Sequence, residues 1–354
     1  MNKKETLVAA LALTADFYRQ NGRVLPWRRD RDAYHVFLSE IMLQQTRVEA
    51  VIPYYERFLT LFPTVTALAE AEEDVLFKAW EGLGYYSRAR NLGRAAKMVV
   101  SVYGGRFPDT YDALLTLPGV GKYTAGAIAS ISFGRPKSAV DGNALRIYTR
   151  LFADGTNIAD EAFKASVTAE LDAAYPAGDT AADTTQGLME IGQRFCVPNG
   201  APRCDSCPLR DLCKVGRGDA DYRLLPYKEK KKPRRILKRT VLLITDGEGF
   251  YLRKRPETGL LAGLWEFPSV EGHLSDADAR KAASALGFDA HGVIGATDGK
   301  HVFTHLEWHM KSYLLPVTKV ETAGFVRATP EEMVEKYAIP SAFRAFLNYI
   351  DERK

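Results

Sequence analysis

The chain has 354 residues, of which 46% are hydrophobic and 26% are charged. This composition excludes a largely disordered protein, because the chain can bury a substantial core, and its length suits roughly two domains of about 150 residues each. The formal net charge of +4 is only mildly basic, so it permits binding to a polyanion without requiring it.

The first residues contain two lysines followed by a short apolar run, which resembles the start of a secretory leader. No small-residue cleavage pattern stands out, and Leu7, Leu11 and Phe17 suit one face of an ordinary helix. No other stretch approaches the roughly 20 apolar residues that a membrane span needs. We therefore expect a cytoplasmic protein without a membrane segment.

Apolar residues recur at three- and four-residue spacings from the start of the chain to about Tyr222, which predicts an all-α domain. Within it, Glu40 stands among the apolar residues Leu38, Ile41 and Met42. Burial there would raise the pKa of Glu40 and favour a protonated acid near neutral pH. The local pattern also fits a surface glutamate on an amphipathic helix.

Residues 117–128, LPGVGKYTAGAI, predict a helix, a tight glycine turn and a second helix. Backbone N–H groups at such a turn can hold a phosphate, as in helix-hairpin-helix elements that grip DNA without reading its sequence. The same letters also fit an ordinary turn.

Asp141 lies in the sequence AVDGN, directly before a further predicted helix. It is either a simple N-cap or a carboxylate that the helix N-terminus keeps ionised. In the second case, Glu40 and Asp141 would form the acid and anion pair that breaks glycosidic bonds.

All four cysteines fall within 18 residues, with the spacing C-x7-C-x2-C-x5-C. In a reducing compartment such a cluster indicates metal ligation better than disulfides. The cysteines are Cys196, Cys204, Cys207 and Cys213.

The character of the sequence changes after the cysteines. Eight of the twelve residues at 228–239 are basic, so residues 222–239 are interpreted as an exposed linker. Strands are predicted at 240–245, 249–255 and 305–315, and helices at about 276–286 and 330–350, which together indicate an α+β domain. His301, His305 and His309 would share one face of a helix, but in a strand His305 and His309 lie about 13 Å apart, so we expect no metal there.

Taken together, these motifs resemble the MutY branch of the endonuclease III superfamily. The resemblance rests on LPWRRDRDAYHVFLSEIMLQQTRVEAVIPYYERF, GLGYYSRARNL, LPGVGKYTAGAI, VDGN and the four cysteines, and it covers about residues 15–215. It implies an all-α helix-hairpin-helix glycosylase domain at 1–222, with a six-helix barrel module at about 30–137 and an iron–sulfur module at about 1–29 and 138–222. A basic linker at 223–238 and an α+β Nudix-like domain at 239–354 would follow.

The resemblance implies a DNA glycosylase that flips adenine out of a duplex in which it is mispaired with 8-oxoguanine or guanine. Glu40 would protonate N7 of the adenine, and Asp141 would stabilise the oxocarbenium ion or attack it transiently. Tyr123 and Asn143 would support the reacting sugar and Asp141.

Further residues match family positions that contact DNA. Gln45 and Tyr85 would wedge into the duplex beside the damaged guanine. The expected pocket residues are Arg23, Leu25, Trp27, Arg28 and Glu190. The expected backbone-gripping residues are Gly119, Val120, Gly121 and Lys122.

Strand-cutting relatives carry a lysine where this chain has Tyr123, so a Schiff base is not available at that position. Lys122 points about 100° away from it on a helix. The resemblance therefore predicts a monofunctional glycosylase, with a bifunctional glycosylase and lyase as the alternative.

The cysteine spacing resembles the family's 4Fe-4S loop, C-x6-C-x2-C-x5-C, with one additional residue after Cys196. Zinc is the alternative occupant. The cluster would fix a loop whose Arg203 and Arg210 contact phosphates.

In the C-terminal part, residues 301–306 resemble the Phe-Ser-His loop by which the family senses 8-oxoguanine, with Thr304 in place of the serine. Phe303 would lie beside the lesion, and Thr304 and His305 would hydrogen bond near it. Residues 259–272 are similar to Nudix folds but lack the clustered carboxylates that hold catalytic Mg²⁺. We expect a monomer whose partner is duplex DNA; a Nudix pyrophosphatase and a non-enzymatic iron–sulfur DNA sensor are the rival interpretations.

Overall fold

The computed structural model describes residues 1–229 and 233–352. Contacts divide the chain into two compact units, one formed by Met1–Glu70 with Asn91–Lys230 and the other by Ala71–Arg90 with Lys231–Lys354. Within the described ranges, no helix is both long and apolar enough to cross a membrane.

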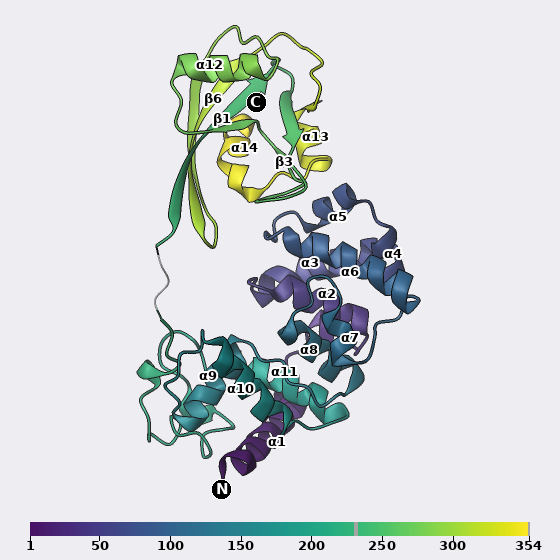
Figure 1. The fold of residues 1–354 in the computed structure, drawn as a ribbon, viewed down its shortest axis with the longest axis vertical. Helices are drawn as coiled ribbons and strands as arrows, with labels where there is room; N and C mark the ends of the chain where they lie inside the picture. The colour runs from purple at the N-terminus through teal and green to yellow at the C-terminus, as the bar shows by residue number, and fades with distance from the viewer. Residues whose placement is uncertain (230–232, 353–354) are drawn as a thin grey trace. The chain divides into compact units, whose positions relative to one another are not determined.

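The first unit is helical, as the apolar spacing predicts (Figure 1). Its helices are α1 (Lys3–Asn21), α2 (Ala33–Leu43), α3 (Val48–Leu61), α4 (Val65–Glu70), the larger part of α6 (Ser87–Tyr103), α7 (Tyr111–Leu115), α8 (Lys122–Phe133), α9 (Gly142–Phe152), α10 (Glu161–Asp172) and α11 (Asp179–Arg194). Short 3-10 turns lie at Pro26–Arg28, Cys204–Ser206 and Tyr222–Leu224.

The start of the chain forms helix α1 and closes a core with helices from the far end of this unit. Asn2 and Glu5 make a reciprocal capping box, and Leu7 and Leu11 are buried. These leucines pack in one cluster with apolar residues of α9, α10 and α11, and Cys196, Cys207 and Cys213 pack against its edge. The cysteine loop therefore packs on helices from opposite ends of this unit, since α1 begins at Lys3 and α11 begins at Asp179.

The predicted helix, glycine turn and helix are confirmed as α7 and α8. Gly119 has φ +78, and a side chain there would place its Cβ 2.7 Å from Cβ of Asn91. Only glycine fits both the left-handed backbone and this close approach. The turn sets the direction of α8, which carries Tyr123 in its first turn.

The second unit contains a seven-stranded sheet of order β3-β2-β1-β6-β5, with β4 paired to β1 and β7 paired to β2. β1 runs parallel to β6, and the remaining pairs are antiparallel. The strands are β1 (Arg235–Thr245), β2 (Phe250–Lys254), β3 (Trp265–Glu266), β4 (Ser269–Glu271), β5 (Ile294–Val302), β6 (Leu306–Pro316) and β7 (Phe325–Ala328). The three predicted strands are confirmed, and β3, β4, β5 and β7 are additional.

Each face of this sheet buries its own core. On one face, Leu242 and Ile244 pack with residues of α12 (Asp276–Ala285), whose predicted range is confirmed. On the other face, Val241 and Leu243 pack with Phe346 of α14 (Arg344–Asp351). Successive side chains of β1 point to opposite faces of the sheet, so this strand contributes apolar residues to both cores, as expected for a sheet that is covered on two sides.

Two sequence expectations in this unit are wrong. The single helix predicted at 330–350 is two helices, α13 (Pro330–Glu335) and α14, because the chain turns through buried Ile339 and Pro340 between them. The basic segment predicted as linker becomes strand from Arg235 onward, where the backbone pairs with β6 starting at Leu306. The charged side chains of this segment indicate exposure to solvent, but they do not show that its backbone is irregular. Residues 230–232 of that segment lie outside the described residues.

The segment Ala71–Arg90 includes α5 (Glu73–Trp80) and groups with the sheet. Lys254 pairs with Asp74 at 2.7 Å, and the Lys78 ammonium donates to the carbonyl of Tyr337 at 3.2 Å.

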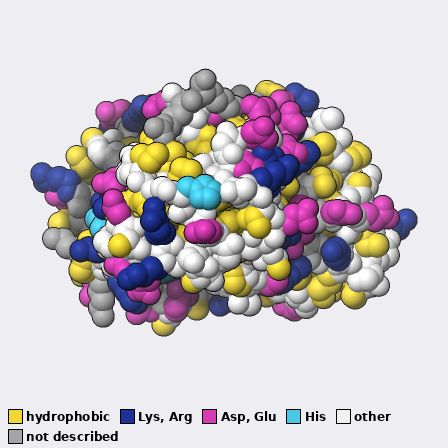
Figure 2. All heavy atoms as spheres, turned by 90° about the horizontal axis from the view of Figure 1, so that it is seen from above, with side chains coloured by type: hydrophobic (Ala, Val, Ile, Leu, Met, Phe, Trp, Pro, Cys, Tyr) yellow, Lys and Arg dark blue, Asp and Glu magenta, His cyan; other side chains and the backbone are white. Residues whose placement is uncertain are grey.

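Figure 2 shows basic and acidic side chains mixed on one face of the molecule, in keeping with the small net charge.

Candidate active site and cysteine cluster

One pocket in the helical unit contains the predicted acid. Its lining includes five residues selected from the sequence: Arg23, Leu25, Trp27, Arg28 and Glu40. The other lining residues are Val36, Ser39, Leu43, Val48, Ile131, Gln186, Met189 and Gln193. The pocket combines apolar walls with a few polar groups, which is typical of a small-molecule site.

Glu40 lies on α2 and is 4% exposed, so it is not the surface glutamate that the local pattern also allowed. Burial raises its pKa to about 7, and the negative charge of Asp141 acts in the same direction. A hydrogen bond from the Tyr123 hydroxyl and the charge of Arg28 oppose this rise. Glu40 can therefore hold a proton near neutral pH.

Asp141 caps the N-terminus of α9 and accepts three hydrogen bonds. The backbone N–H groups of Asn143 and Ala144 donate at 2.8 and 2.9 Å, and the side-chain amide of Asn143 donates at 2.7 Å. Burial nevertheless raises the pKa of Asp141, against the lowering effect of these bonds and of Arg146. Two opposing effects therefore act on Asp141: its hydrogen bonds favour the expected anion, and burial disfavours it.

Tyr123 lies near both acids. Its hydroxyl donates to Glu40, and both Glu40 and Asp141 raise its pKa together with burial, which is the largest cause. Asp141 does not line the cavity of Glu40. The structure thus brings the two predicted acids into electrostatic contact, with Tyr123 near both of them.

Arg146 joins Asp141 to the cysteine loop, a link that the sequence analysis did not anticipate. This guanidinium is 5% exposed; Nη2 donates to the side-chain oxygen of Asn143 at 2.8 Å, and Nε donates to the backbone carbonyl of Cys196 at 2.5 Å. The signal that could have indicated this role is an arginine within a helix that is otherwise buried, because a buried charge needs partners.

Glu190 lies behind the pocket wall, outside the lining. It is fully buried, and it pairs with Nε of Arg23 at 2.8 Å and with Nη1 of Arg28 at 2.7 Å. It therefore orients two lining arginines.

Gln186 is a lining residue that the sequence analysis missed. It is 7% exposed, and its Oε1 accepts a hydrogen bond from the Tyr18 hydroxyl at 2.8 Å, which fixes the amide orientation. Its position four residues before Glu190, on the same face of α11, was the available signal.

The two predicted wedge residues share an unusual backbone. Gln45 has φ 57 and Tyr85 has φ 50, and both are exposed. Only Ala153 and Leu261 join them as non-glycine residues with positive φ in the described parts of the chain. Left-handed backbone is costly for such residues and concentrates at functional positions.

The backbone groups predicted to grip DNA lie at the start of α8. Gly121 is the N-cap and makes no side-chain capping bond, and Gly121 and Lys122 are exposed. Val120 is buried and closes the turn by donating to the carbonyl of Leu117 at 3.0 Å. The N-terminus of α8 thus offers N–H groups to solvent, where an anion can accept them.

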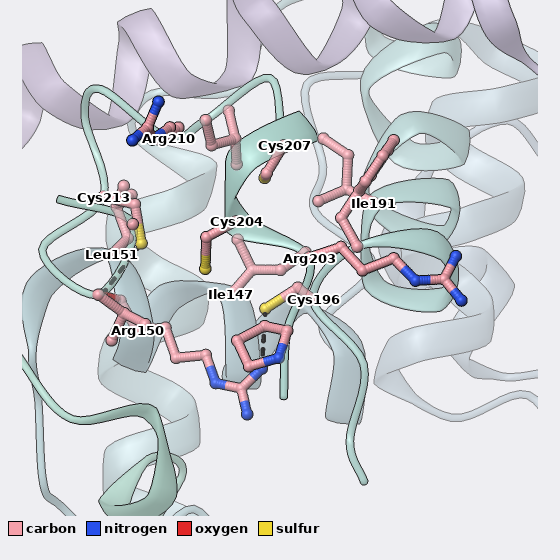
Figure 3. A pocket seen from close by; sticks show the side chains of 15 residues that line it. Ile147, Arg150, Leu151, Ile191, Cys196, Arg203, Cys204, Cys207, Arg210 and Cys213 are labelled. Atoms are coloured by element: carbon pink, nitrogen blue, oxygen red, sulfur yellow. Dashed lines mark hydrogen bonds between the residues drawn. The ribbon is translucent and has the colours of Figure 1, made fainter. Parts of the chain in front are cut away.

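All four cysteines line one cavity (Figure 3). Its other lining residues are Ile147, Arg150, Leu151, Ile191, Phe195, Pro202, Arg203, Leu209, Arg210, Val215 and Gly216. Burial raises the pKa of the Cys207 thiol to about 12. In the described ranges, no three His, Cys, Asp or Glu side chains are placed to hold a single metal ion.

The donor set of this cavity fits an iron–sulfur cluster. Among the described residues that line it, the four cysteines are the only ones of a metal-binding type, and four cysteine thiolates are the ligands of a 4Fe-4S cluster. The guanidinium of Arg150 donates to Sγ of Cys196 at 3.3 Å and is 3% exposed, so it can offset negative charge on this sulfur. The insertion after Cys196 leaves all four thiols at the same cavity.

The predicted reading loop is the tip of the β5–β6 hairpin. Thr304 and His305 are exposed, and the Thr304 hydroxyl lies 3.3 Å from the Tyr85 hydroxyl within the same unit. Phe303 is half-buried, with its ring 5.0 Å from that of Trp308. The hairpin therefore presents two of the three predicted side chains to solvent and packs the third.

Comparisons with known proteins agree with this architecture. Residues 38–170 match the family model of the HhH-GPD superfamily base excision DNA repair proteins, and residues 240–349 match the NUDIX domain model. A thermostable thymine-DNA glycosylase of known structure superposes with a TM-score of 0.54 at 28% identity, over 60% of this chain and 98% of that one. An endonuclease III trapped on DNA has the same fold, with a TM-score of 0.51 at 24% identity, over 62% and 99% of the two chains.

Curated relatives carry the name adenine DNA glycosylase. The human protein is 34% identical over 86% of this chain and 67% of its own length, and that of Buchnera aphidicola from Acyrthosiphon pisum is 34% identical over 73% of each. The Arabidopsis thaliana protein is 38% identical over 72% of this chain, but the match spans only 46% of that longer relative. The chain therefore belongs to the adenine DNA glycosylase family, with a helical HhH-GPD part followed by a Nudix-like part.

Proposed function

We propose that this chain is a DNA glycosylase of base excision repair that hydrolyses the N-glycosidic bond of adenine mispaired with 8-oxoguanine or guanine. One observation supports this most strongly: Glu40, whose pKa is raised to about 7, lines a pocket together with five residues that the resemblance or the structure places there, and the charge of the hydrogen-bonded Asp141 reaches it. A proton donor beside a stabilised carboxylate is the arrangement that glycosidic cleavage needs.

In this proposal Glu40 gives its proton to N7 of a flipped adenine, which makes the base a better leaving group. Asp141 then stabilises the positive sugar, or attacks it transiently, before water completes hydrolysis. Asn143 and the backbone of α9 keep Asp141 in place, and Arg146 keeps Asn143 in place. The pair supplies a proton and a negative charge on the two sides of the bond that breaks.

The walls of the cavity would hold the adenine ring. Trp27 and Leu25 are nearly buried and provide apolar surface, and Gln186 provides an amide whose orientation is fixed by Tyr18. Arg23 and Arg28 are held by Glu190 and line the same space. An amide can pair with the exocyclic and ring nitrogens of adenine.

Tyr123 also decides the class of reaction. Its hydroxyl is buried beside Glu40, and burial together with the charges of Glu40 and Asp141 raises its pKa well above the ordinary value, so the phenol stays neutral. A tyrosine side chain has no amine and therefore forms no Schiff base with the sugar in either protonation state. We therefore propose a monofunctional glycosylase that leaves the DNA strand intact.

The four cysteines would hold a 4Fe-4S cluster, which contributes structure at the loop carrying Arg203 and Arg210. Those arginines, together with the N-terminus of α8, would contact DNA phosphates. Protein purified without oxygen should contain about four iron and four sulfide ions per chain. Stoichiometric zinc with little iron would contradict this assignment.

The exposed wedge and hairpin residues would engage the opposite strand. Gln45 and Tyr85 are displayed by strained backbone, which suits insertion beside an unpaired guanine. Thr304 and His305 offer hydrogen-bonding groups for 8-oxoguanine. Phe303 would have to leave its packing against Trp308 to stack on the lesion.

One duplex tests the reaction. A duplex that carries adenine opposite 8-oxoguanine is incubated with the chain. The sample is then divided, and only one half is treated with hot alkali. The proposal predicts free adenine and strand breaks only after alkali. Breaks without alkali, with borohydride trapping of the chain on DNA, would indicate a lyase, and DNA binding without any free adenine would indicate a non-enzymatic sensor.

A further inference from the structure

The loop that joins α5 to α6 has an unusual backbone. Gly82, Gly84 and Tyr85 have positive φ, at 100°, 71° and 50°. Glycine adopts this conformation readily, but for a tyrosine it is unfavourable. The Tyr85 side chain is also 47% exposed, although Leu83 and Tyr86 close to it in the loop are buried. Contacts with the rest of the unit must therefore stabilise this exposed and strained residue.

Arg88, in the first turn of α6, holds this loop from the buried side. Its side chain is 7% exposed, and Nη2 donates to the carbonyls of Leu83 and Gly84 at 2.9 and 3.1 Å. Its backbone N–H donates to the carbonyl of Tyr85 at 2.8 Å. A guanidinium suits this arrangement, because its planar fork presents several donors in fixed directions. Three consecutive carbonyls of the loop are therefore bonded to one residue.

The same guanidinium lies over two aromatic rings. Its central carbon is 5.2 Å from the ring centre of Trp80, which is fully buried, and 5.5 Å from that of Tyr85. Burial lowers the pKa of Arg88 to about 10, so this group remains charged at neutral pH, and a cation is attracted to the face of an aromatic ring. The Tyr85 hydroxyl lies 3.3 Å from that of Thr304. The backbone, the ring and the hydroxyl of Tyr85 thus each have a contact that limits movement.

We propose that Arg88 is a positioning residue that holds the Tyr85 ring ready to insert into the DNA duplex. This inference rests on the proposed function, in which Tyr85 wedges into the duplex beside the base opposite the adenine. Inserting a side chain between bases offsets the cost of unstacking them, and a ring that is already fixed loses little conformational entropy when it binds. Because Arg88 is buried, it acts on the DNA through Tyr85.

A fluorescent duplex reports insertion of the ring. 2-Aminopurine is placed next to 8-oxoguanine, because its fluorescence changes when its stacking on a neighbouring base is broken. A 2′-fluoro group on the adenosine sugar slows excision, so that binding is measured alone. With the full-length chain, Arg88→Lys should bind this duplex about tenfold more weakly and lose most of the fluorescence change at saturating protein. As the matched control, Arg280→Lys alters an exposed arginine of α12 and should behave as the unaltered chain.

A double-mutant cycle separates positioning of Tyr85 from general stability. Tyr85→Ala removes the ring and should itself weaken binding about tenfold. If Arg88 acts through that ring, the double variant with Arg88→Lys and Tyr85→Ala binds the duplex as Tyr85→Ala alone does. A purely structural arginine would instead weaken binding by the same factor with and without the ring.

A second substitution covers a failure to fold. If Arg88→Lys does not fold, Arg88→Met takes its place in the same comparisons, because methionine has a similar length and leaves no charge to bury. Unaltered binding and fluorescence in the folded Arg88 variant, or the same loss of binding with and without the Tyr85 ring, would overturn the proposal.

The single variants also distinguish this inference from the function on which it rests. If Tyr85→Ala binds the duplex and changes its fluorescence as the unaltered chain does, the wedge assignment fails and the inference fails with it. If Tyr85→Ala loses the signal and the Arg88 variant keeps it, only the inference fails. Release of free adenine by the unaltered chain is measured on the duplex without the 2′-fluoro group, so the glycosylase assignment has its own test.

Discussion

Two carboxyl groups in one site differ because their immediate surroundings differ. Glu40 is buried on an apolar helix, and its pKa rises to about 7. Burial also raises the pKa of Asp141, but three hydrogen bonds favour the ionised form of this carboxyl group. The negative charge of Asp141 is in turn one cause of the raised pKa of Glu40. In the proposed reaction, Glu40 supplies the proton and Asp141 supplies the negative charge.

The rate of adenine excision should fall as pH rises through about 7, because Glu40 must carry its proton to act as an acid. Single-turnover rates measured from about pH 5 to about pH 9 would give the midpoint. Tyr123→Phe removes the hydrogen bond that lowers the pKa of Glu40, so the midpoint should move to higher pH. A midpoint that moves to lower pH in this variant would contradict the assigned hydrogen bond.

The same shift predicts a stability cost. A raised folded-state pKa favours the folded chain below pH 4.5, and this contribution is lost as pH rises through about 7. Glu40→Gln should therefore unfold at the same denaturant concentration as the original chain near pH 4. Near pH 8 its unfolding free energy should be higher by up to about 3 kcal/mol. A pH-independent difference in denaturant titrations would count against a buried, perturbed Glu40.

At the scale of elements, the N-terminus of α9 connects the reaction site to the cysteine loop. Asp141 caps the helix, Asn143 bonds to Asp141, and Arg146 reaches from Asn143 to the carbonyl of Cys196. The sequence places Asp141 directly before a helix, so its capping position could be predicted. The role of Arg146 could not, because its partner lies 50 residues further along the chain.

Gly192 on α11 lets the two helices approach at this point. A side chain there would place its Cβ 2.6 Å from Cβ of Asn143, so Gly192→Ala should displace Asn143 and lower the excision rate about tenfold or more. Gly155→Ala meets open space and serves as the matched control. Equal excision rates for the two variants would show that the contact of α9 with α11 does not support Asp141.

The secondary structure was predictable where local patterns decide it. The spacing of apolar residues gave the helical unit, and alternation gave three strands of the sheet. Contacts with distant residues decided the rest. The charged start of β1 forms a strand because it pairs with β6. The helix expected at 330–350 is interrupted where Ile339 is buried in the core. Gln186 was missed for a similar reason, since its partner Tyr18 lies 168 residues away.

At the scale of the whole molecule, the two units carry different parts of the proposed recognition. The helical unit holds Glu40 and Asp141, and the sheet-containing unit displays Thr304 and His305 on a hairpin. We therefore expect chemistry and choice of the opposite base to be separable by mutation.

Thr304→Val removes a hydroxyl without changing size and should reduce the preference for 8-oxoguanine over guanine about tenfold, the worth of one hydrogen bond. The excision rate of adenine opposite guanine should stay unchanged. Thr304→Ser keeps the hydroxyl and should retain the preference. Parallel single-turnover assays on the two duplexes measure this ratio, and an unchanged ratio in Thr304→Val would remove Thr304 from recognition.

The central claim is that Glu40 and Asp141 perform base removal together. The most direct measurement compares free adenine released in a single turnover with duplex binding, in the same preparations of Glu40→Gln, Asp141→Asn and the unaltered chain. The account predicts that each variant binds the mismatched duplex as the unaltered chain does and releases adenine at least about a hundredfold more slowly. Adenine release at the unaltered rate by either variant would contradict it.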